Sequence, residues 1–98
     1  MKIGYAQASA KNRNLNQQID ALKKAGVDEI HTEIVNSAKA DRPVLAAILK
    51  KLNADDVLVI WKLDQLGSSI RLIDLVSMLM ERGIGLLSIH DHTDTPAS

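Results

Sequence analysis

The sequence contains no cysteine. This absence excludes a disulfide framework, a thiolate metal site and a cysteine nucleophile, and reducing cytosol is the expected environment. Large aromatic side chains are nearly absent as well, since Tyr5 and Trp61 are the only ones. The core must therefore be built from Leu, Ile, Val and Ala. The chain also has no excess of positive or negative charge, because twelve basic residues balance twelve acidic ones. Binding to nucleic acid through phosphate neutralisation by this domain alone is therefore not expected.

Long hydrophobic runs are missing too. The opening "MKIGYAQAS" carries one lysine and no extended apolar segment, so it does not have the pattern of a signal peptide. No window approaches the roughly 18 uncharged apolar residues that a membrane span requires. A chain of 98 residues can bury one core. We therefore expect a single cytoplasmic domain over residues 1–98, without membrane association.

The spacing of apolar residues alternates along the chain between the strand pattern and the helix pattern. Gly26 and Gly83 stand where glycine commonly ends a helix, and Pro43 suits a first helical turn. We expect strands over 2–8, 29–35, 57–61 and 84–89, helices over 15–25, 43–52 and 70–82, a polar loop over 36–41 and an irregular tail over 90–98.

This order of elements predicts an α/β fold. Right-handed crossovers between successive strands give a mostly parallel sheet with helices on both faces. The apolar run "VLVIW" indicates a central strand covered on both faces. In "EIHTEIV", Ile30, Thr32 and Ile34 alternate with polar neighbours, which indicates a strand covered on one face.

The predicted helix over 70–82 is apolar nearly all round. A helix with this pattern is usually buried on more than one side, which in a small domain indicates a partner subunit. Its apolar residues are Ile70, Leu72, Ile73, Leu75, Val76, Met78, Leu79 and Met80.

Polar side chains follow three of the predicted strands, in "AQAS", "NSAKADR" and "LDQLGSS". Ligands of open α/β sheets bind beyond the carboxyl ends of the strands, so these segments form the candidate site. A serine near an arginine and a carboxylate can attack an acyl or phosphoryl centre. The alternative is that Ser9 caps a turn and Asp64 holds loop amides. The candidate residues are Ser9, Lys39, Arg42, Asp64, Ser68 and Ser69.

The remaining motifs give little evidence for a functional site. The sequence contains no P-loop, no G-x-S-x-G elbow and no G-x-G-x-x-G run. His90 and His92 flank Asp91, with Asp94 close by, but a tail without a third fixed ligand does not predict a metal site. His31 is expected to be a surface or packing residue.

Five segments resemble the serine recombinases, the family of resolvases and DNA invertases. "IGYAQAS" is similar to the family's opening I-G-Y-A-R-V-S, and "NLNQQIDALKKAG" resembles the helix after it. "SAKADRPVLAAIL" is similar to S-G-x-x-x-x-R-P-x-L, and "DDVLVIWKLDQLGSS" is similar to G-D-x-L-V-V-W-K-L-D-R-L-G-R-S. "MERGIGLLSIHDHTDT" resembles the E-R-G-x-x-F-x-S-L-x-x-x-I-D-T stretch. The resemblance follows nearly the whole chain in order.

The resemblance implies a three-layer, flavodoxin-like α/β catalytic domain with a mostly parallel sheet of four to five strands. Ser9 would attack a DNA phosphodiester and form a 5′-phosphoserine link, with neither metal nor cofactor. Arg42 and Asp64 occupy catalytic positions of the family, and Gln18 also matches it. The family uses arginines near this serine because guanidinium groups suit the charged oxygens of a phosphoryl transition state.

Three of those arginines are replaced, by Gln7, Gln65 and Ser68, and Arg13 stands where the family usually has glutamine. Loss of one transition-state donor costs roughly 10²–10³ in rate, so we expect impaired catalysis. The alternative is a catalytically inactive recombinase-fold module for interaction or dimerisation. A receiver-like domain would need an acidic cluster after the first strand, which "AQAS" does not supply.

The resemblance also implies which partners to expect. The sequence stops at "TDTPAS", where the family continues into a long dimerisation helix and a helix-turn-helix DNA-binding domain, and both are expected to be absent from residues 1–98. DNA would then be bound mainly through the missing domain. The full-length protein is expected to form a homodimer or tetramer, without a small-molecule substrate.

Overall fold

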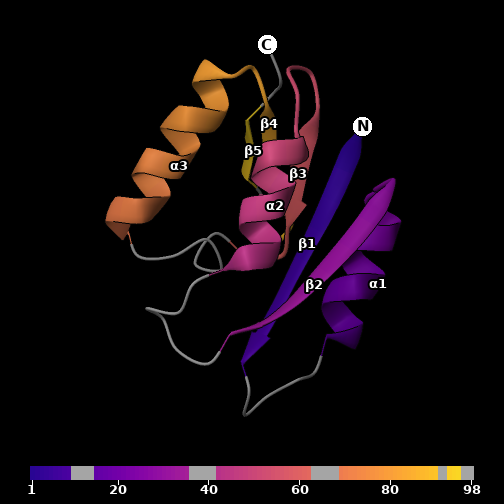
Figure 1. Ribbon diagram of the computed structural model, residues 1–98. Helices are drawn as coiled ribbons and strands as arrows, with labels where there is room; N and C mark the ends of the chain where they lie inside the picture. The colour runs from indigo at the N-terminus through magenta and orange to yellow at the C-terminus, as the bar shows by residue number, and fades with distance from the viewer. Residues whose placement is uncertain (10–14, 36–41, 63–68, 91–92, 96–98) are drawn as a thin grey trace.

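The computed structural model describes residues 1–9, 15–35, 42–62, 69–90 and 93–95, and shows alternating strands and helices (Figure 1). This alternation confirms the expected α/β fold, and the predicted helices agree with the observed ones to within one residue at each end. The elements are β1 (Lys2–Ser9), α1 (Asn16–Lys24), β2 (Glu29–Val35), α2 (Pro43–Lys51), β3 (Val57–Ile60), α3 (Ser69–Glu81), β4 (Gly85–Ser88) and β5 (Thr93–Thr95).

The strands form one five-stranded sheet in the order β2-β1-β3-β4-β5. The first four are parallel, whereas β5 runs antiparallel to β4. The expectation of an irregular tail over 90–98 is therefore wrong for Thr93–Thr95. These residues supply hydrogen-bonding partners to β4, which would otherwise leave its outer backbone groups unpaired at the sheet edge.

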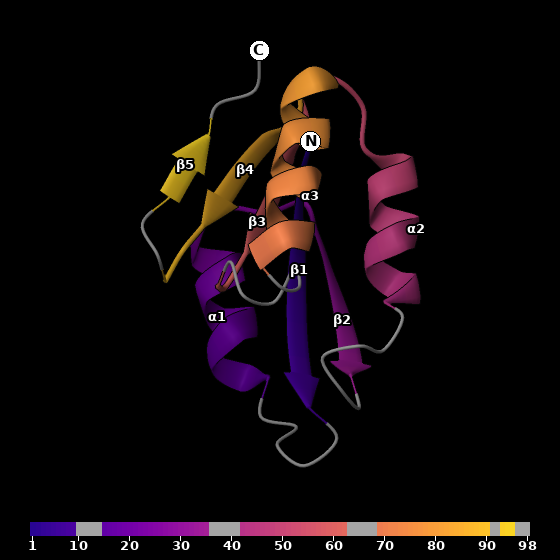
Figure 2. The ribbon, with the colours of Figure 1, turned by 90° about the vertical axis from the view of Figure 1, so that its left-hand side faces the viewer.

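Helices cover both faces of the sheet, in three layers (Figure 2). Alternate residues of β3 point to opposite faces, so that Leu58 and Ile60 belong to one core cluster and Val59 to the other. On one face, Leu45 and Ile48 of α2 pack with Leu79 of α3 and with residues of the sheet; on the other, Leu22 of α1 packs against the sheet. The prediction that this strand is covered on both sides is confirmed.

The covered face of β2 differs from the expectation. Its alternation predicted a strand correctly, but Ile34 is 41% exposed and Thr32 is exposed, while Glu33 and Val35 are buried. Helix α2 lies over the face that carries Glu33, and the carboxylate of Glu33 finds hydrogen-bond donors there. A buried carboxylate is tolerated when such donors are present, so the polar side chain lies inside.

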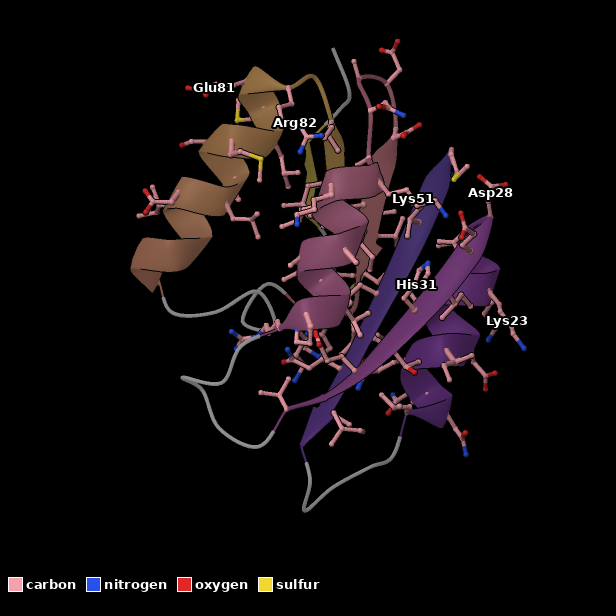
Figure 3. The ribbon with its side chains drawn as sticks, in the orientation of Figure 1. Lys23, Asp28, His31, Lys51, Glu81 and Arg82 are labelled. Atoms are coloured by element: carbon pink, nitrogen blue, oxygen red, sulfur yellow. The ribbon has the colours of Figure 1, made fainter. Side chains whose placement is uncertain are left out.

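Arg82 joins the end of α3 to the end of α2 (Figure 3). Its Nη1 donates to the carbonyl of Leu49 at 2.8 Å and its Nη2 to that of Leu52 at 2.6 Å. The last carbonyls of a helix have no partner within the helix, so a guanidinium is well matched to them. The chain then turns at Gly83, which has a φ of 73°.

Helix α3 is covered on one side. Leu79 is 1% exposed, but Ile73 is 65% and Met80 is 58% exposed. These two residues are seven positions apart, so they lie on the same side of the helix. Among the described side chains of α3, this side is uncovered in the single chain, and its burial by a partner subunit stays a prediction. No helix in the part of the chain that the structure describes is long and apolar enough to cross a membrane.

Candidate active site

Two strands and the start of a helix meet at the carboxyl edge of the sheet, at the lower side of Figure 1. Strand β1 ends at Ser9, which is in register with Val35, the last residue of β2. Helix α2 begins at Pro43, directly after Arg42. The fold thus brings the predicted nucleophile position and the predicted cation position to one edge, although 33 positions separate Ser9 from Arg42 in the sequence.

The end of β1 is held by a side chain of α1. The backbone N–H of Gln7 donates to Oε1 of Gln18 at 3.1 Å, and Nε2 of Gln18 donates to the carbonyl of Gln7 at 2.9 Å. Among the described residues, pairing of β1 with β3 extends only to Tyr5 and Ile60, and the amide of Gln18 takes the place of a strand partner beyond that point. These two bonds fix the backbone two residues before Ser9.

Glu33 lies at the centre of the site and is 6% exposed. Its Oε1 accepts a hydrogen bond from the Tyr5 hydroxyl at 2.7 Å, and its Oε2 accepts one from the backbone N–H of Val44 at 2.9 Å. The N–H of Leu45 donates to Oε1 at 3.4 Å. A single buried carboxylate therefore connects β1, β2 and the first turn of α2.

Tyr5 links Glu33 to Gln7. The hydroxyl of Tyr5 accepts a hydrogen bond from Nε2 of Gln7 at 3.0 Å while it donates to Glu33. Burial, followed by the hydrogen bond to Glu33, raises the pKa of Tyr5 well above its ordinary value, and the positive charge of Arg42 opposes this shift. The phenol therefore stays protonated and serves as a fixed donor at neutral pH.

Arg42 occupies the N-cap position of α2, and its carbonyl accepts the N–H of Ala46 at 2.9 Å. Its side chain makes no capping hydrogen bond. Its Nε is buried and has no hydrogen-bond partner among the described residues. A guanidinium donor at a strand edge, with its backbone fixed in a helix cap, is suited to binding an anionic oxygen.

The other predicted site residues are described less fully. Asp64, Lys39 and Ser68 lie outside the described residues, as do Gln65 and Arg13. The backbones of Ser9 and Ser69 are described, in β1 and α3, but their side chains are not. Of the predicted catalytic residues, the structure therefore brings together the Ser9 backbone and Arg42.

The sequence patterns did not reveal the roles of Glu33 and Tyr5. Two signals were present: Glu33 shares the parity of Val35 on β2, and a predicted helix begins shortly afterwards at Pro43. An acidic residue of that parity is able to reach the free amides of the following helix.

A cavity of about 330 Å³ lies between α2 and β2, the strand that carries Glu33. Its lining is mostly apolar, and its two polar side chains are His31 and Lys51. Lys51 is already paired with Glu29, at 2.6 Å. His31 thus packs against α2 and is partly exposed, as expected.

No group of three metal-ligating side chains occurs among the residues that the structure describes. His92 and Asp91 fall outside them. The ring of His90 contacts Trp61, with the ring centres 5.4 Å apart and the planes tilted by 58°.

Known proteins match this chain over nearly its full length. The family described as "Resolvase, N terminal domain" matches residues 2–98. The serine recombinase gin of Escherichia phage Mu is 44% identical over 96 residues, covering 97% of this chain and 50% of its own length. The DNA-invertase hin of Salmonella typhimurium is 40% identical over 97 residues, covering 98% of this chain and 51% of its own.

A resolvase is similar to the same extent. The transposon Tn917 resolvase of Enterococcus faecalis is 40% identical over 99 residues, covering 100% of this chain and 54% of its own length. The chain thus spans about half the length of the curated relatives that it matches. The chain belongs to the resolvase N-terminal domain family, among the serine recombinases and DNA invertases.

Proposed function

We propose that this chain is the catalytic domain of a site-specific DNA recombinase, of the resolvase and invertase class. Ser9 is the nucleophile. Its Oγ forms a bond to the phosphorus of a DNA phosphodiester, the bond from phosphorus to the 3′ oxygen breaks, and that oxygen leaves as a 3′-hydroxyl. The proton lost by Ser9 balances the one gained by the leaving oxygen. The observation that carries the proposal is the meeting of Ser9 and Arg42 at one sheet edge.

Arg42 supplies the charge stabilisation that remains. Phosphoryl transfer places negative charge on the non-bridging oxygens, and an enzyme acts mainly by positioning donors toward them. The buried Nε of Arg42, without a partner among the described residues, supports this role. Asp64 is proposed as the carboxylate of the site on the strength of its motif alone.

The chemistry is proposed to be impaired. Gln7 cannot supply positive charge, and its side chain already donates to Tyr5. Gln65 and Ser68 are neutral as well. Loss of one donor costs roughly 10²–10³ in rate, and losses at several positions of one site leave little activity even if they are not additive. Position 7 is in register with Glu33, so an arginine there would be a cross-strand neighbour of a carboxylate.

DNA and oligomer formation belong to the same proposal. The chain is neutral overall, so the segment that binds DNA specifically is proposed to lie outside residues 1–98. The full-length protein is proposed to act as a dimer or tetramer on DNA, because cleavage and exchange of two duplexes require several active sites.

The test uses this chain fused to a family-type DNA-binding region. We compare the present sequence with a triple variant, Gln7→Arg, Gln65→Arg and Ser68→Arg, on a nicked DNA substrate that traps the covalent intermediate. The restored protein is expected to form the adduct, and the present sequence is not. Ser9→Ala in the restored background is the control and should abolish it. Lack of adduct from the restored protein would contradict the proposal.

A second candidate function is an inactive module that associates through α3. The exposed Ile73 and Met80 favour it, because large apolar side chains on one side of a helix are typical of an interface. Sedimentation of Ile73→Lys, with the exposed Asp74→Lys as control, tests it. Unchanged self-association in the Ile73 variant would exclude this candidate.

A further inference from the structure

We infer that Glu33 is the positioning residue of this site: its carboxylate fixes the first turn of α2, and with it Arg42, against the end of β1. The inference rests on the proposed function for its catalytic meaning. The contacts of Glu33 themselves stand independently of any activity.

Glu33 performs the task that an N-cap side chain usually performs. Since Pro43 is the first residue of α2, Val44 and Leu45 are the second and third, and these are the amides that a capping oxygen normally accepts. Arg42, the N-cap residue, makes no such bond with its side chain. Both amides donate instead to Glu33, which lies on the neighbouring strand. The cap therefore also anchors the helix to the sheet.

The charge of Glu33 makes this anchor specific. Among the described residues, none of the ion pairs includes Glu33, although the side chain is 6% exposed. A buried charge without a paired cation requires strong donors. The positive end of the α2 dipole and the Tyr5 hydroxyl provide them. A neutral or shorter side chain would not hold the same three donors.

The residues that form the anchor are close in sequence to the predicted catalytic residues. Arg42 precedes the capped turn by one residue, so its backbone is fixed with that turn. Tyr5 lies four residues before Ser9 on β1, and the charge of Arg42 acts on its phenol. The chain from Tyr5 through Glu33 to Val44 thus sets the distance between the end of β1 and Arg42. In an enzyme active site, a misplacement of about 1 Å can cost roughly 10² in rate.

The first experiment requires no catalytic activity. Amide hydrogen exchange of Val44 and Leu45 and the ¹⁵N relaxation of Arg42 Nε are measured by NMR in Glu33→Gln and Glu33→Asp. We expect exchange at both amides to rise roughly tenfold or more relative to Leu58 in the core, with greater mobility of Arg42 Nε. Glu29→Gln is the matched control, on the same strand and facing the same helix, and should leave these signals unchanged.

Unchanged exchange at Val44 and Leu45 in both Glu33 variants would overturn the inference. If Glu33→Gln does not fold, Tyr5→Phe provides the milder test, because it removes one donor and leaves the carboxylate in place. Faster exchange at the two amides in Tyr5→Phe supports the anchor, and equal exchange refutes it.

The second experiment uses the arginine-restored fusion protein. Glu33→Gln should slow formation of the Ser9–DNA adduct roughly 10²-fold with little change in DNA affinity. In an Arg42→Ala background, the same substitution should have little further effect, because it acts through Arg42. Additive losses would refute a positioning role. If the restored protein forms no adduct, the proposed function fails, and the exchange experiment alone decides whether Glu33 anchors α2.

Discussion

Strand β2 is tied to α2 at both ends by a glutamate, and the two ties differ in kind. At the carboxyl end, Glu33 is buried and accepts hydrogen bonds from Tyr5, Val44 and Leu45. At the amino end, Glu29 forms an exposed ion pair with Lys51 at 2.6 Å. Removal of a buried carboxylate leaves several buried donors without a partner. Removal of one member of an exposed ion pair leaves the other member hydrogen-bonded to water. The end that contributes more to stability is therefore the end at the candidate site.

His31 lies on β2 between the two glutamates, beside Lys51 in Figure 3. Its Nε2 is 3.5 Å from Oε1 of Glu29 and is buried without a hydrogen-bond partner among the described residues. The face of β2 toward α2 thus carries Glu29, His31 and Glu33 in succession. Both glutamates accept hydrogen bonds there, whereas Nε2 of His31 does not take part in one among the described residues.

Substitution of Glu33 should have the largest effect on stability. Glu33→Ala leaves the amides of Val44 and Leu45 and the hydroxyl of Tyr5 without their partner. We expect the free energy of unfolding to fall by about 2–4 kcal/mol. Urea denaturation measures it, with Glu29→Ala as the control, which should have a much smaller effect. Equal losses for the two glutamates would contradict the comparison.

Substitution of Arg82 should have an intermediate effect. Its guanidinium binds the carbonyls of Leu49 and Leu52 at the end of α2 that Lys51 also holds. Arg82→Ala is expected to lower the free energy of unfolding by about 1 kcal/mol, since the group is solvent-exposed. Arg82→Lys should recover only part of the loss, because an ammonium group does not reproduce the geometry in which two guanidinium nitrogens donate to two carbonyls. Complete recovery would show that charge alone suffices.

The smallest effect should come from the Glu29–Lys51 pair, and it depends on pH. The hydrogen bond from Lys51 is the main cause that lowers the pKa of Glu29 below its ordinary value of 4.5. A carboxyl with a lowered folded pKa adds stability above its ordinary value, and this stability is lost as the pH falls through the folded pKa. Lys51→Met should therefore flatten the stability profile below about pH 4.5.

NMR titration of the Glu29 carboxyl measures this directly, and its pKa should rise in Lys51→Met. Asp56 is the internal control. The backbone N–H of Asn53, and then the N-terminal ammonium, lower its pKa, and neither depends on Lys51. A pKa of Asp56 that moved together with that of Glu29 would indicate a general change of structure.

Local periodicity predicted most of the fold. The helices were predictable because Pro43, Gly26 and Gly83 mark their ends, and "VLVIW" indicated the central strand. Strand β5 was missed because a segment of three residues is too short to show the alternation of a strand, and its pairing depends on the free edge of β4. The buried residues of β2 were predicted wrongly because a carboxylate side chain is normally exposed to solvent. The backbone donors that make burial of Glu33 favourable belong to another element, α2.

The candidate site was predictable only in part. The motif and the rule for open sheets placed Ser9 and Arg42 at one edge, and the fold brings their backbones there. The bond from Gln18 to the Gln7 backbone depends on where β3 stops pairing with β1. No residue pattern gives that position, because it is a property of the assembled sheet.

The most direct test of the proposed function is the identification of the residue that becomes linked to DNA. After incubation of the arginine-restored fusion protein with a nicked substrate, nuclease and protease digestion followed by mass spectrometry locates the attached nucleotide. We predict a 5′-phosphodiester on Ser9 in the restored protein and none in the present sequence. Attachment at another residue, or equal attachment in both proteins, would contradict the account.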